Sequence, residues 1–318
     1  MASLLVQIWH FCKVTAHKYN VDMTLHAVQI RPDGNIPIPN IASSLDEVTG
    51  SLPSGFYTTF SSLAQGTRVL GLQAHLDRLY LPAKERKLKP AVDENTLRER
   101  IAELVKENLP HESRVRLILT KERGEIFTAI QPFIPLAKEI YENGVHVITS
   151  TVARSDPRIK GTDFIAKSAE QRKLVRGDVF EILLTHNGKI LEGMTSNFYA
   201  IVHPVIATKQ SPITSLDAAL PPKPAATLLT AQKEILLGVT RRAVLKIARG
   251  QGLSIEYRPL RVGEKFDEAF LTSSSRGVVP IISIDESLVG QGQVGAWAKT
   301  LSKAYQAYVW ERSEKIVR

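Results

Sequence analysis

The sequence predicts a two-domain protein of mixed helices and strands, in the α/β (α+β) class. Its 318 residues are enough for two domains that each bury a core. Residues 24–135 read as mixed strands and helices, whereas the second half is richer in strands. The stretch QPFIPLAKEIYENG (131–144) contains two prolines and is typical of a linker. We therefore place a small α/β domain at 23–135 and a larger domain at 136–318.

The composition argues against several protein classes. Hydrophobic residues make up 43% and charged residues 23%, as in ordinary globular proteins. No apolar run reaches the ~18–20 residues of a membrane span, and the N-terminus has no basic secretory signal. The one cysteine, Cys12, excludes an internal disulfide and favours a reducing compartment, so we expect a cytoplasmic protein. The net charge of +9 comes from scattered residues without a nucleic-acid-binding signature, and the alternative of a nucleic-acid binder predicts salt-sensitive retention of DNA or RNA.

The first half begins with 22 residues that differ from the rest and end just before Met23. They are either an extension preceding the true start or an N-terminal helix packed on the body. HAVQIRPDGNIPI (26–38) predicts a strand and a turn at Asp33-Gly34. DENTLRERIAELVKENLP (93–110) predicts an amphipathic helix capped by Asp93. SRVRLILTK (113–121) then alternates like a strand.

The second half predicts strands, then a closing helix. VHVITSTVA (145–153) reads as a strand, and residues 178–202 read as a three-strand meander with a hairpin turn at Asn187-Gly188. Residues 203–235 are rich in Pro, Ala and Thr and predict a surface insertion. Residues 238–252 predict a helix that Thr240 could cap, and 267–285 predict two strands around a serine-rich turn. Residues 294–312, VGAWAKTLSKAYQAYVWER, predict the last helix. One face of this helix is apolar and is formed by Trp297, Leu301, Ala304, Tyr305 and Tyr308.

One motif has to be set aside. GQGQVG (290–295) matches the dinucleotide fingerprint G-x-G-x-x-G, but that fingerprint needs a strand before it and an acidic residue about twenty residues later. No strand follows the last helix, so we predict a hairpin tip and a helix start here. Cys/His metal spacings are absent from the sequence, and we predict no metal site.

Five separated segments resemble one enzyme family. They are HLDRL (75–79), DPRIKGTDF (156–164), LEGMTSNF (191–198), and ILLGVTRRAV (235–244) followed by DEAFLTSSSRGVVPI (267–281). In this order they are similar to the class IV pyridoxal-phosphate aminotransferases, which include branched-chain and D-amino-acid aminotransferases and aminodeoxychorismate lyases. The family patterns are E-G-x-x-S-N-x-F, L-P-G-I-T-R and D-E-x-F-x-T, and the resemblance covers residues 24–310. It implies fold type IV, with a barrel-like core in the larger domain, pyridoxal 5'-phosphate between the domains, and a homodimer.

The resemblance also implies roles for single residues. Lys160 aligns with the lysine that forms the internal aldimine and moves the substrate proton. Glu192 aligns with the carboxylate that keeps the cofactor's ring nitrogen protonated. The other residues implied to bind the cofactor are Arg78, Thr195, Ser196, Asn197, Leu236, Gly238, Val239, Thr240 and Ser274; among them Arg78, Ser274 and the backbone N–H groups of Val239 and Thr240 would hold the phosphate.

Several departures from the family pattern affect the substrate. Phe164 replaces an aromatic hydroxyl near the cofactor, and Thr58 replaces an acidic residue in GFYTTF (55–60). The residues expected to meet the substrate are Tyr57, Arg116 with its strand neighbour Arg114, Ser275 and Arg276. An aminotransferase is the leading activity, with pyruvate elimination by a lyase, or cofactor binding without turnover, as alternatives.

Overall fold

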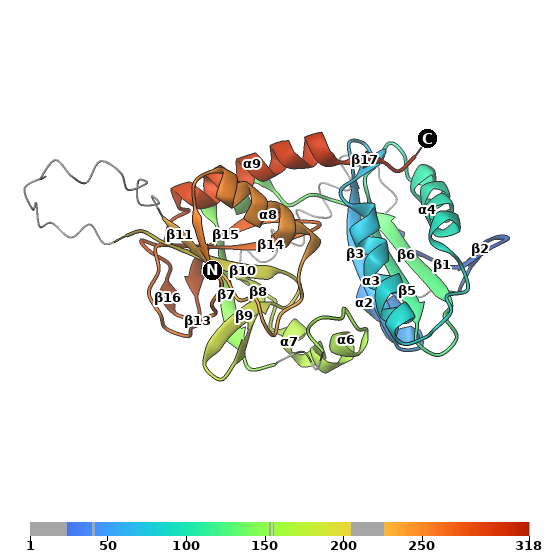
Figure 1. The fold of residues 1–318 in the computed structure, drawn as a ribbon, viewed down its shortest axis with the longest axis horizontal. Helices are drawn as coiled ribbons and strands as arrows, with labels where there is room; N and C mark the ends of the chain where they lie inside the picture. The colour runs from blue at the N-terminus through green and yellow to red at the C-terminus, as the bar shows by residue number, and fades with distance from the viewer. Residues whose placement is uncertain (1–23, 40–41, 153, 155, 205–225, 318) are drawn as a thin grey trace, which may run out of the picture.

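The computed structural model describes residues 24–39, 42–152, 154, 156–204 and 226–317, which form two β-sheets with helices packed against them (Figure 1). The first 22 residues and most of the expected insertion at 203–235 lie outside this part. None of the described helices is long and apolar enough to cross a bilayer.

The first sheet is built from strands between residues 26 and 132, with one edge strand from the end of the chain. In the described chain its strand order is β17-β4-β3-β5-β6-β1-β2. The strands are β1 (His26–Arg31), β2 (Gly34–Pro37), β3 (Gly55–Leu63), β4 (Arg68–Val69), β5 (Ser113–Thr120), β6 (Ile126–Pro132) and β17 (Glu314–Lys315), and the helices are α2 (Leu45–Ser51), α3 (Leu72–Glu85) and α4 (Glu94–Glu107). The predicted helix at 93–110 is confirmed, because Asp93 caps α4 by accepting from the N–H groups of Asn95 and Thr96. Its apolar face is buried in the core of this sheet.

The second sheet is built from strands between residues 145 and 288 and curls into half a barrel (Figure 1). Its order is β12-β11-β10-β14-β15-β7-β8-β9-β13, with β16 beside β15. The strands are β7 (Val145–Ser150), β8 (Val179–His186), β9 (Lys189–Gly193), β10 (Asn197–Val202), β11 (Thr227–Leu229), β12 (Ser254–Glu256), β13 (Leu260–Arg261), β14 (Glu268–Ser273), β15 (Gly277–Ile284) and β16 (Ser287–Leu288). The helices are α5 (Lys138–Asn143), α6 (Asp163–Lys167), α7 (Ala169–Lys173), α8 (Val239–Gly250) and α9 (Ala296–Arg312).

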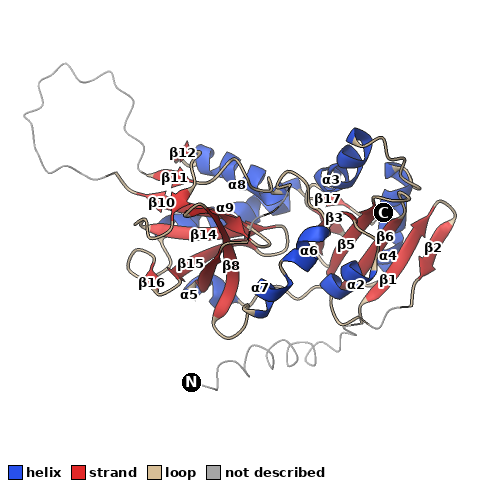
Figure 2. Cartoon of the chain, turned by 90° about the horizontal axis from the view of Figure 1, so that it is seen from below, coloured by secondary structure: helices blue, strands red, loops and turns tan. Residues whose placement is uncertain are grey.

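Helices α8 and α9 cover one face of the second sheet, and Figure 2 shows α6 and α7 between the two sheets. The rings of Tyr199 and Phe270 stack 4.7 Å apart beneath α8 and α9. On α9, Leu301 and Tyr305 are buried as the apolar stripe predicts, together with Ala298.

The structure corrects six local predictions. Strand β10 pairs with β11 and β14 and not with β9, so residues 178–202 do not form a three-strand meander, and the short strand β17 follows the last helix. The proposed linker at 131–144 contains the end of β6 and all of α5. Helix α8 is capped by Gly238 and not by Thr240, which lies inside the helix. The first hairpin turns at Pro32-Asp33, because Arg31 pairs with Gly34. Part of the expected insertion is β11, a strand that pairs with both β10 and β12.

Candidate active site

The loop that carries Lys160 is held against the small sheet. Tyr57 N–H donates to the Lys160 carbonyl over 2.9 Å, and Thr162 N–H donates to the Gly55 carbonyl over 3.0 Å. Gly55 N–H in turn donates to Thr162 Oγ1 over 2.8 Å. The loop therefore pairs with β3 like a short extra strand, which directs Lys160 into a cavity of about 250 Å³ between the two sheets.

The Lys160 amine is buried among cations. Its Nζ lies 4.8 Å from the centre of the Tyr57 ring. Burial lowers the pKa of Lys160 well below the ordinary value, and repulsion from Arg154 and Arg78 lowers it further. This shift favours the uncharged amine, which is the form that attacks a carbonyl carbon.

Glu192 lies on the same cavity and forms a buried ion pair with Arg154. Its Oε1 accepts from Arg154 Nε over 2.8 Å, and its Oε2 accepts from the Leu236 N–H over 3.0 Å. Burial raises the pKa of Glu192, whereas Arg154 opposes this shift. The Arg154 guanidinium also stacks 3.8 Å from the centre of the Phe164 ring and donates to the Met194 carbonyl. Phe164, which stands where the family pattern has an aromatic hydroxyl, thus packs against Arg154, the partner of Glu192.

An anion cradle lies at the N-terminus of α8. The first N–H groups of a helix have no partner within the helix, so Val239 and Thr240 offer donors on the cavity wall. Arg78 lies beside them, with Nη2 donating to the Leu237 carbonyl over 2.7 Å. Burial, and then repulsion from Arg242, lowers the pKa of Arg78 to about 10, so it stays charged at neutral pH.

Asn197 positions this cradle through its own side chain. Its Nδ2 donates to the Leu236 carbonyl over 2.7 Å, and its Oδ1 accepts from the Gly238 N–H over 3.1 Å. A Cβ atom at Gly238 would collide with Asn197 Oδ1, which explains a glycine at this helix start. The neighbouring Ser196 hydroxyl is buried on the cavity wall and has no partner in the described chain.

Thr195 and Arg276 belong to a second network, which is built on the buried Glu181. Glu181 Oε1 accepts from the Thr195 N–H over 2.6 Å and from its hydroxyl over 2.9 Å. Glu181 Oε2 accepts from Arg276 Nη2 over 2.6 Å. The guanidinium expected to meet the substrate is therefore already paired with a carboxylate that is only 3% exposed. Ser274 and Ser275 lie on the cavity wall beside it.

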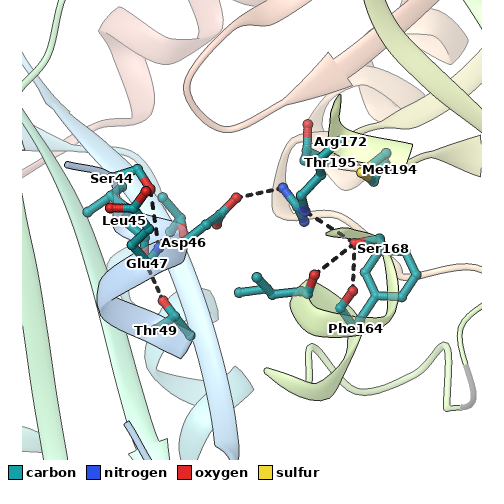
Figure 3. A network of polar contacts seen from close by, with 12 residues as sticks. Ser44, Leu45, Asp46, Glu47, Thr49, Phe164, Ser168, Arg172, Met194 and Thr195 are labelled. Atoms are coloured by element: carbon teal, nitrogen blue, oxygen red, sulfur yellow. Dashed lines mark hydrogen bonds and ion pairs between the residues drawn. The ribbon is translucent and has the colours of Figure 1, made fainter. Parts of the chain in front are cut away.

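Arg116 is also committed to an acid. Its Nη1 donates to Asp46 Oδ1 over 2.6 Å, to the Leu45 carbonyl and to Thr49 Oγ1, all on α2. Figure 3 shows Asp46 reaching across to Arg172 on α7, whose Nη1 donates to Asp46 Oδ2 over 2.7 Å. Asp46 therefore links an arginine of the small sheet to one of the larger domain. Burial opposes ionisation of this carboxyl, but the two arginines hold the pKa of Asp46 below its usual value.

Changing Asp46 to Asn should weaken this link in a pH-dependent way. We expect a loss of about 1–2 kcal/mol in the free energy of unfolding at pH 7. Because the pKa of Asp46 is depressed in the folded state, its contribution is complete above about pH 4 and is lost as the pH falls through the folded value. Urea titrations at pH 7 and pH 3 measure this, with Asp33→Asn in the exposed first turn as the control. Equal losses for the two variants at pH 7 would contradict the link.

The residues present fit pyridoxal phosphate. The cavity carries an amine whose pKa is lowered, a carboxylate, and an anion cradle with an unpartnered hydroxyl at Ser196. The cavity also has a flat apolar wall at Leu236, which is buried. These groups match the aldehyde, the ring nitrogen, the phosphate and the ring face of that cofactor. Among the described residues there is no cluster that could hold a metal ion.

The structure brings all the predicted cofactor and substrate residues to this one cavity, and it adds others that the sequence did not indicate. The predicted residues on its wall are Tyr57, Arg78, Arg116, Lys160, Glu192, Thr195, Ser196, Asn197, Leu236, Gly238, Val239, Thr240, Ser274, Ser275 and Arg276. Sequence analysis missed Arg154, Glu181, Asp46 and Arg172. Only Arg154 had a local signal, since it lies six residues before Lys160 in the same loop.

Comparisons with known proteins agree with this geometry. Residues 55–284 match the model of the family described as amino-transferase class IV. A D-alanine aminotransferase from Bacillus licheniformis is 28% identical over 260 residues, covering 77% of this chain and 85% of that protein. A probable branched-chain-amino-acid aminotransferase from Thermotoga maritima is 30% identical over 214 residues, covering 65% of this chain and 69% of that protein.

Solved structures share the fold. A putative branched-chain amino acid aminotransferase from Thermotoga maritima superimposes with a TM-score of 0.69 at 23% identity, covering 90% of this chain and 96% of that one. The PLP-bound form of a hypothetical aminotransferase from Mycobacterium tuberculosis gives a TM-score of 0.67 at 19% identity, covering 90% of this chain and 99% of that one.

Proposed function

The chain belongs to the class IV aminotransferases, and on this premise we propose that it moves an amino group between an amino acid and a 2-oxo acid with pyridoxal 5'-phosphate bound at Lys160. The observation that carries the proposal is the convergence of the Lys160 amine, the Glu192 carboxylate and the α8 N-terminus on one cavity. When bound, pyridoxal phosphate supplies the electron sink for the bond that breaks at the substrate Cα.

Lys160 is the nucleophile and then the proton carrier. Its lowered pKa favours the free amine, which would condense with the aldehyde of pyridoxal phosphate and release water. Once displaced by a substrate amine, the Lys160 Nζ would accept the proton from the substrate Cα and deliver it to the cofactor. The Tyr57 ring, 4.8 Å from Nζ, limits the space in which that amine moves.

Glu192 holds the proton on the cofactor's ring nitrogen. A carboxylate stabilises a pyridinium by a charge-assisted hydrogen bond, and it must stay ionised to do so. Burial favours the neutral acid, whereas the ion pair with Arg154 favours the charged form that this role requires. Arg154 therefore acts through Glu192 as a positioning residue.

The remaining residues anchor the phosphate and the ring. The N–H groups of Val239 and Thr240, the Arg78 guanidinium and the hydroxyls of Ser196 and Ser274 surround the cradle and would bind a dianion. Leu236 covers the ring face. We also expect a cytoplasmic homodimer, which size-exclusion chromatography with light scattering tests for the oligomeric state.

A half-reaction screen tests the proposed activity. Purified protein loaded with the cofactor is mixed with single L- and D-amino acids, and the visible absorbance is followed. At least one amino acid should convert the coloured aldehyde form to the pyridoxamine form within seconds to minutes. A protein that stays coloured with every amino donor would contradict aminotransferase function and favour a cofactor-binding protein without turnover.

A further inference from the structure

A second cavity of about 280 Å³ adjoins the active-site cavity, and the proposed function does not use it. The two cavities share the N-terminus of α8 and the turn between β14 and β15, at Val239, Thr240 and residues 274–276. The second cavity is further bounded by the end of β3, by α3 and by α9. Lys160 and Glu192 line only the active-site cavity. A molecule in the second cavity would therefore lie apart from the reacting amine.

Apolar side chains make up much of the wall of the second cavity. Tyr141 donates its hydroxyl to the Arg276 carbonyl over 2.9 Å, and the Tyr305 hydroxyl lies 3.4 Å from Thr240 Oγ1. Both phenols therefore have partners within the chain. Sites for small molecules are typically apolar with a few polar groups. The apolar and aromatic residues of the wall are Phe60, Leu63, Leu70, Phe133, Pro135, Tyr141, Val239, Val278, Tyr305 and Val309.

Two buried polar side chains of this wall each have an atom without a partner. His75 is 1% exposed; its Nδ1 lies 2.7 Å from Thr58 Oγ1, but its Nε2 has no hydrogen-bond partner in the described chain. Ser61 is 4% exposed, and its Oγ is also without a partner there. Burial lowers the pKa of His75 well below 6.5, so the ring is neutral at pH 7. Unpaired buried polar atoms are unfavourable, so this wall is suited to a ligand with a polar group.

Glu112 gives the second cavity an acid without a basic partner. The charged residues on the described wall are Glu112 and Arg276, and Arg276 is paired with Glu181 over 2.6 Å. Burial raises the pKa of Glu112, and a hydrogen bond from the Ala64 N–H offsets this shift only in part. Phe133 N–H donates to the Glu112 carbonyl over 2.7 Å, so an aromatic residue adjoins the acid. A carboxylate among aromatic side chains favours an organic cation.

We propose that the second cavity binds an organic amine, with its positively charged nitrogen at Glu112 and its apolar body among the aromatic side chains. Ser61 and His75 would hydrogen-bond the polar end of this molecule. The ligand is bound and not converted, because Lys160 lies on the other cavity. This inference goes beyond the proposed function and does not depend on it.

A matched pair of probes isolates the positive charge. N,N-dimethylbenzylamine is charged at neutral pH, and as a tertiary amine it cannot condense with an aldehyde. The alcohol 2-methyl-1-phenylpropan-2-ol has the same benzyl group and two methyl groups but no charge. Titration calorimetry on the cofactor-loaded protein should show one site that binds the amine roughly 10- to 100-fold more tightly than the alcohol.

Variants then locate the bound amine. In Glu112→Gln the preference for the amine should fall to within a few-fold, whereas Glu107→Gln, which changes an exposed acid at the end of α4, should keep the full preference. Ser302→Trp places an indole into the second cavity from the half-buried side of α9 and should weaken binding of both probes at least about ten-fold. Lys160→Ala should bind the amine as the wild type does. Circular dichroism checks that each variant is folded.

Three outcomes would overturn the proposal. The first is a wild-type protein that binds the alcohol as tightly as the amine, and the second is no binding of the amine up to millimolar concentrations. Neither depends on a variant that folds, and the second would assign the unpartnered atoms to buried water. The third is amine binding that is lost in Lys160→Ala but kept in Ser302→Trp, which would place the amine in the active-site cavity. Because the binding test involves no turnover, it can fail while the half-reaction screen succeeds.

Discussion

Replacing Lys160 with alanine should lower kcat for transamination by at least about 10³-fold. The variant loses both the covalent attachment of the cofactor and the base that moves the substrate proton, and proton transfer alone contributes about 10²–10⁴-fold. The protein should still fold, because alanine removes a buried amine whose pKa is depressed in the native state. The measurement is single-turnover conversion of an amino acid by cofactor-saturated protein.

Lys167→Ala is the matched control. Lys167 lies seven residues after Lys160, at the exposed end of α6, and it should retain activity within about two-fold. Addition of a small primary amine should restore part of the activity of Lys160→Ala, since such an amine can stand in as the base. Full activity in Lys160→Ala would show that another residue carries the chemistry.

Changing Arg154 to methionine should cost about 3–5 kcal/mol in the free energy of unfolding of the cofactor-free protein. The Arg154 and Glu192 side chains are only 4% and 3% exposed, so the variant leaves an unpaired carboxylate in the interior. Urea titration monitored by circular dichroism measures the loss. Arg158→Met, which changes an arginine that is 87% exposed in the same loop, should lose less than about 1 kcal/mol.

The pH dependence of Arg154→Met follows from the orphaned acid. Without Arg154, burial raises the folded-state pKa of Glu192 further above its unfolded value. A group whose pKa is raised in the folded state destabilises the fold at pH values above its unfolded-state pKa. The loss in the free energy of unfolding should therefore grow from pH 5 to pH 8. Adding Glu192→Gln to this variant should remove most of the dependence. A loss that is the same at both pH values, or no loss at all, would contradict the role of the ion pair.

Much of the fold was predictable because its signals are local. The α4 helix has an apolar stripe and an aspartate cap within one stretch of chain, and the β8–β9 hairpin turns at Asn187 and Gly188, both with positive φ. The predictions that failed depended on tertiary context. The two prolines at 132 and 135 suggested a linker, yet Pro132 is the last residue of β6 and pairs with Ser113 on β5. Thr240 suggested a cap, but the cradle needs the close approach that only Gly238 allows.

In the candidate site, too, the predictable residues are those with local sequence signals. Lys160 and Glu192 could be proposed because short motifs surround each of them. The ion pairs of the cavity wall could not be proposed, because they join distant segments of the chain. Arg116 and Asp46 are 70 residues apart, and Arg276 and Glu181 are 95 residues apart. A sequence displays arginines but not which of them the fold neutralises. For this reason the sequence indicated Arg116 and Arg276 as substrate residues but did not indicate that Asp46 and Glu181 pair with them.

The most direct test of the account is to find the residue that bonds to the cofactor. Protein saturated with pyridoxal phosphate is reduced with borohydride, digested and mapped by mass spectrometry. The account predicts one pyridoxyl group, on Lys160, and its loss in Lys160→Ala. A label on Lys167 or Lys189, with Lys160 unmodified, would contradict the convergence of amine, acid and anion cradle in this cavity.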